Sequence, residues 1–88
     1  MNQPQPFGLA SVATERLERM FRHLHRQELA CPLTPVGLVC IGLQDNLEAV
    51  MSVLRGLDRS GVRAVLVAVL AERRAEAART NAAATHEH

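Results

Sequence analysis

The sequence contains no lysine, tryptophan or tyrosine, and Phe7 and Phe21 are its only phenylalanines. Tryptophan and tyrosine are common anchors of protein interfaces, and aromatic rings are the surfaces on which single-stranded nucleic acids stack. Their absence argues against a stacking-based nucleic-acid site. It also requires a core built from aliphatic side chains, which the 48% hydrophobic content can supply.

Long apolar runs are absent as well. The longest, residues 36–43 and 64–71, fall far short of the ~20 residues that a membrane-spanning helix needs. The N-terminus lacks the positive segment and apolar stretch of a secretory signal. We therefore expect a soluble, cytoplasmic protein, and the Lys-free, Ala-, Val- and Leu-rich composition suggests a bacterial source with a GC-rich genome.

Cysteine is scarce: Cys31 and Cys40 are too few for a disulfide framework, and their spacing matches no usual zinc motif. Buried free thiols are the expected state. A metal site would require the fold to gather His25 with both cysteines, which the sequence leaves open. We predict no metal, no cofactor and no catalytic residue, and therefore no enzyme, because so small an aliphatic domain offers few convergent polar groups.

What the sequence does contain is helical periodicity, which predicts one all-α domain over residues 11–79, with helices at about 11–29, 35–57 and 61–79 in an antiparallel bundle. The segments 1–10 and 80–88 are expected to be a flexible leader and a flexible tail. The first helix has an apolar stripe of Leu17, Met20, Phe21 and Leu24. The second opens on Thr34 and Pro35. Its apolar positions repeat every three or four residues: Val36, Cys40, Leu43, Leu47, Val50, Leu54 and Leu57.

A different interpretation of residues 36–70 remains open. Residues 36–42 could form a buried strand and residues 62–70 a second one, which would give an α/β fold with a βαβ unit over 36–70. Gly37 and Gly42 favour this alternative, because each weakens a helix by about 1 kcal/mol relative to alanine. The uninterrupted heptad spacing favours the helix.

The third helix is apolar on more than one face. Between Val62 and Ala71 only Arg63 is polar, and a helix that is apolar all round must be buried all round. Two partner helices from one short chain cannot cover it, so we expect a homodimer or larger assembly that completes the bundle. The predicted interface residues are Val62, Ala64, Val67, Ala68, Ala71, Ala75 and Ala78.

These features predict a small helical module that binds itself, and a protein partner, in a regulatory or adaptor role. The alternative is a dimeric DNA-binding regulator of helix-turn-helix type, whose contacts would come from Arg63, Arg73 and Arg74. The net charge of +1 provides no overall basic field for nucleic acid. Interleaved acids also make a solvated, salt-bridged face the simpler explanation of the arginines.

Overall fold

The structure, a computed structural model, describes residues 7–86 of the chain and the side-chain surroundings of residues 8–81. In chain order the helices are α1 (Phe7–Ala10), α2 (Thr14–His25), α3 (Pro35–Cys40), the 3₁₀ turn η1 (Gln44–Asn46), α4 (Leu47–Leu54) and α5 (Arg59–His86). Residues 7–86 contain no strand, which confirms the all-α prediction. The βαβ alternative is wrong, because its first segment forms α3 and its second lies inside α5.

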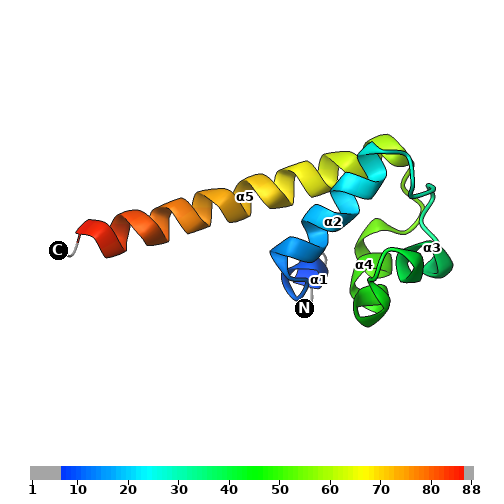
Figure 1. Ribbon diagram of the computed structural model, residues 1–88, viewed down its shortest axis with the longest axis horizontal. Helices are drawn as coiled ribbons and strands as arrows, with labels where there is room; N and C mark the ends of the chain where they lie inside the picture. The colour runs from blue at the N-terminus through cyan, green and yellow to red at the C-terminus, as the bar shows by residue number, and fades with distance from the viewer. Residues whose placement is uncertain (1–6, 87–88) are drawn as a thin grey trace.

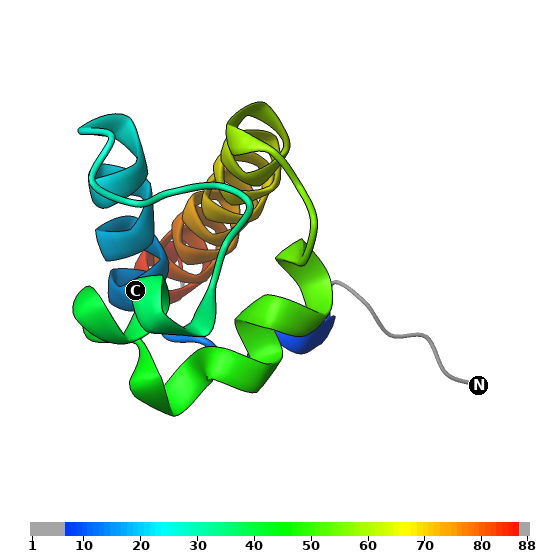
Figure 2. The ribbon, with the colours of Figure 1, turned by 90° about the vertical axis from the view of Figure 1, so that its right-hand side faces the viewer.

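The helices form a compact body from which one long helix projects. Helix α2 lies along the N-terminal half of α5. Helices α1, α3 and α4 lie together against one side of the α2–α5 pair (Figures 1 and 2). The C-terminal half of α5 extends beyond the body (Figure 1). The radius of gyration is 14.4 Å, whereas a compact domain of this length has about 12 Å. The expected antiparallel three-helix bundle is therefore an oversimplification of this arrangement.

The core is entirely aliphatic, as the shortage of aromatics requires, and no polar residue is buried among the described side chains. Helix α2 contributes the predicted stripe: Leu17, Met20 and Leu24 are buried, and Phe21 packs beside them half-exposed. Helix α5 contributes Val62, Leu66 and Leu70 at helical spacing.

The single helix expected over 35–57 is interrupted at Gly42. Thr34 caps α3 as predicted, because its Oγ1 accepts the backbone N–H of Gly37 at 3.1 Å. Gly42, with a φ of +86°, then ends the helix in a Schellman motif. In this motif the Leu43 N–H donates to the Leu38 carbonyl, and both leucine side chains are fully buried.

The interruption at Gly42 changes which residues are buried in the core. In a continuous helix Val36 and Cys40 would share the buried stripe with Leu43. Instead Val36 is 73% exposed and Cys40 is also exposed, while Leu38 and Ile41 enter the core. The prediction of a regular aliphatic seam from 36 to 57 is correct only for its second half.

The predicted ends of the domain also shift. Residues 7–10 of the expected leader form α1, whose Leu9 is buried, and residues 80–86 of the expected tail belong to α5. Residues 1–6 and 87–88 lie outside the described part, so their expected flexibility stays a prediction. Helix α5 begins at Arg59 rather than near 61, and Asp58 caps it by accepting the Gly61 N–H at 2.8 Å.

Candidate functional site

The outward face of α5 carries most of the predicted interface. Five alanines at helical spacing are exposed, and Val67 beside them is 47% exposed. We call this surface the outer strip; it consists of Ala64, Val67, Ala68, Ala71, Ala75 and Ala78. Val62, which was predicted with them, is fully buried in the chain's own core, because it lies on the opposite side of the helix.

The outer strip extends from the body onto the projecting half of α5. Beyond Leu70 only Arg73 is even partly buried among the described side chains of this helix. An isolated helix shorter than about 12–15 residues is marginal in water, because nucleation is costly. The projecting half therefore gains little from its own chain and would gain stability from a second helix.

The three arginines of the nucleic-acid hypothesis have different roles. Arg73 is held inside the chain: its Nη1 donates to the Val12 carbonyl at 2.6 Å and its Nη2 to the Leu9 carbonyl at 2.8 Å. Nη1 also lies 3.0 Å from Thr14 Oγ1. Arg73 thus fastens the α1–α2 connection to α5. Arg63 and Arg74 are exposed and remain the cations on which that hypothesis can rest.

The cysteines do not form a joint site. Cys31 is half-buried, and burial raises the pKa of its thiol, with a smaller opposing effect from Arg59. Cys40 is exposed, so the prediction of a buried thiol fails there, because Cys40 lies on the outer face of α3, opposite the buried Leu38. Among the described residues, no three histidine, cysteine or acidic side chains are grouped closely enough to hold a metal ion.

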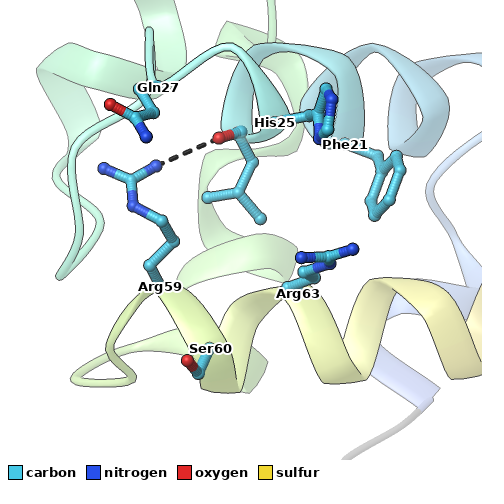
Figure 3. A pocket seen from close by; sticks show the side chains of 7 residues that line it. Phe21, His25, Gln27, Arg59, Ser60 and Arg63 are labelled. Atoms are coloured by element: carbon cyan, nitrogen blue, oxygen red, sulfur yellow. Dashed lines mark hydrogen bonds between the residues drawn. The ribbon is translucent and has the colours of Figure 1, made fainter.

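Sequence reasoning missed a pocket of about 290 Å³ between the end of α2 and the start of α5 (Figure 3). Arg59 and Arg63 rise from α5 towards Gln27, His25 and Phe21. Leu24 and Ser60 complete the lining. The two arginines are four residues apart, a spacing that places them on one face of a helix and that the sequence did display.

The end of α2 shapes one wall of this pocket. Gln27 has a left-handed backbone with a φ of +62° and occupies the position that glycine usually takes in a Schellman motif. The Glu28 N–H donates to the His23 carbonyl at 2.8 Å, which closes the motif. Their side chains also meet, with His23 Nδ1 2.8 Å from Glu28 Oε1. Arg59 Nη1 donates to the Leu24 carbonyl at 3.1 Å and joins α5 to this turn (Figure 3).

None of the helices between residues 7 and 86 has the length and apolar character needed to cross a membrane. Comparisons with known protein families, with curated proteins and with solved structures give no match to this chain.

Proposed function

We propose that the protein is a homodimeric interaction module, in a regulatory or adaptor role, that assembles through the outer strip of α5. The observation that carries this proposal is the exposure of a regular apolar strip on a helix that projects from its own body. Small side chains allow two helix axes to approach closely, so the outer strip can pack against a copy of itself. The body lies against the opposite face of α5 and does not obstruct this contact (Figure 1).

Charges beside the outer strip favour an antiparallel pair. Glu72 and Arg79 each follow a strip alanine, so they border the same edge of the strip, whereas Arg74 precedes Ala75 and borders the other edge. In a symmetric antiparallel pair, equal edges of the two helices adjoin. When the two helices cross between Ala75 and Ala78, Glu72 faces Arg79 of the second copy, twice per dimer.

A parallel pair would be less favourable. Opposite edges adjoin in that arrangement, which places Arg74 beside Arg79 of the second copy, and like charges repel. Arg79 already contacts Glu76 within the chain, and both side chains are about two-thirds exposed. Because Arg79 stays about two-thirds exposed beside Glu76, a second carboxylate can still approach its guanidinium group.

The mass of the protein in solution tests this proposal. Sedimentation equilibrium is expected to give twice the 9.6 kDa mass of the chain. Ala75→Glu introduces a charge into the outer strip and should shift the equilibrium towards monomer. Ala77→Glu is the matched control, because Ala77 is exposed on the same helix but lies off the strip. A monomeric wild type, or equal loss of dimer in both variants, would overturn the proposal.

A further inference from the structure

The pocket between α2 and α5 has an unbalanced charge. Of its seven lining residues none is acidic, and two are arginines. Neither Arg59 nor Arg63 forms an ion pair with any side chain in the described range 8–81. Like charges four residues apart on a helix repel one another, so an anion between them would remove that cost. Arg16 and Arg79, in contrast, each have a carboxylate neighbour.

The orientation of Arg59 is fixed by its own chain. One of its guanidinium nitrogens donates to the Leu24 carbonyl at 3.1 Å, so the remaining donors keep a defined direction. Arg63 is exposed and rises beside it from the next turn of α5 (Figure 3). Arginine presents its donors as a planar fork that suits phosphate oxygens. Gln27 lies on the same side of α5 as Arg59 and adds an amide that can donate to the same anion.

Part of the lining is apolar. Phe21 is half-buried, so its ring offers a hydrocarbon surface in the pocket, whereas Leu24, which is only 2% exposed, adds almost none. A free inorganic ion would leave this surface uncovered, whereas an anion that carries an apolar group would cover it. Two permanent cations also match the two charges of a phosphate monoester better than the single charge of a carboxylate.

We propose that this pocket binds a small phosphate monoester, with the phosphate between the guanidinium groups of Arg59 and Arg63 and the apolar group against Phe21. The site lies at the first turns of α5 and is distinct from the projecting half of the helix. The proposal therefore holds or fails independently of the proposed dimer.

Phenyl phosphate is a suitable probe, followed by ¹H–¹⁵N NMR of the intact chain at low ionic strength. Saturable shifts are expected for the backbone amides of residues 24–27 and 59–63. Arg63→Ala should weaken binding by about tenfold, the effect expected for loss of one charge-assisted contact. Arg55→Ala, which removes an exposed arginine outside the pocket, should leave the affinity unchanged. The dispersion of each spectrum shows that the variants are folded.

Two further probes test the chemistry of the ligand. Inorganic phosphate lacks the apolar group and benzoate lacks the second charge, so both should bind more weakly than phenyl phosphate. The proposal is overturned if phenyl phosphate gives no saturable shifts, if Arg63→Ala and Arg55→Ala bind it equally, or if either simpler anion binds as tightly.

Discussion

Arg73 shows how much one side chain can contribute when its geometry is fixed. It reaches from α5 to the backbone carbonyls of Leu9 in α1 and Val12 in the α1–α2 connection, which are more than sixty residues away in the chain. Hydrogen bonds from a charged donor are stronger than neutral ones, and the planar fork of arginine serves both carbonyls at once. Its neighbour Arg74 has the same charge but is exposed.

Arg73 and Arg74 therefore form a matched pair for a measurement of the free energy of unfolding. Arg73→Ala should lower the free energy of unfolding by about 2 kcal/mol, because two carbonyls lose a charged donor. Arg73→Lys should recover only part of the loss, since an ammonium group cannot reproduce the fork. Arg74→Ala should change stability by less than about 0.5 kcal/mol. Urea denaturation measures all three, and equal losses at 73 and 74 would contradict the structural role of Arg73.

The two thiols should differ in reactivity with iodoacetamide. Cys40 is exposed, whereas Cys31 is half-buried with a raised pKa, so at neutral pH less of Cys31 is the reactive thiolate. Mass spectrometry of digests should find Cys40 alkylated first. The lag of Cys31 should shorten as the pH rises towards its pKa, because its thiolate fraction grows. Faster alkylation of Cys31 at neutral pH would show that its surroundings are not those described.

At the scale of the elements, two Schellman motifs decide where helices stop. One has glycine at the left-handed position, Gly42, and the other has Gln27. A side chain at a left-handed residue costs about 1–2 kcal/mol, so the two sites should respond in opposite ways to substitution. A Cβ at Gly42 would also lie 2.9 Å from Arg19 Nη1, which must then shift.

Opposite substitutions test this account. Gly42→Ala should lower the free energy of unfolding by about 1–2 kcal/mol. Gln27→Gly should raise it by about 0.5 kcal/mol, since relief of strain outweighs the greater freedom of glycine in the unfolded chain. Urea denaturation of both variants gives the two signs. If Gly42→Ala is stabilising, the helix continues through this position and the break at Gly42 is incorrect.

Periodicity was sufficient to predict the elements that are regular. The stripe of α2 follows directly from spacing, and the Thr34 cap of α3 follows from residue type. Spacing could not reveal the break at Gly42, because Leu43 and Leu47 fit the same heptad whether or not the helix is continuous. The signal was local: a glycine followed at once by a leucine that could fold back onto Leu38.

The outer strip could be predicted from the sequence, whereas the pocket and the role of Arg73 could not. The outer strip depends on spacing within one helix, so all its members were predicted, together with Val62, which the body buries. The pocket depends on how α2 meets α5, which spacing within either helix cannot give. The role of Arg73 was missed for the same reason, since one acceptor, Leu9, belongs to the expected leader and the other, Val12, to the start of the expected first helix.

At the scale of the whole molecule, the shape follows from the length of α5. Its 28 residues exceed what the small body can cover, and a helix of that length spans about 42 Å. The body buries the first turns, while the outer strip continues along the exposed remainder. Antiparallel pairing through this surface is the central claim about function.

A charge exchange between Glu72 and Arg79, followed by sedimentation equilibrium, tests this claim most directly. Glu72→Arg and Arg79→Glu should each weaken the dimer, because each places like charges together across an antiparallel pair. Circular dichroism of each variant checks that α5 remains helical. The double variant restores opposite charges and should recover most of the wild-type affinity. A wild type that stays monomeric, or a double variant that dimerises no better than the single ones, would contradict the account.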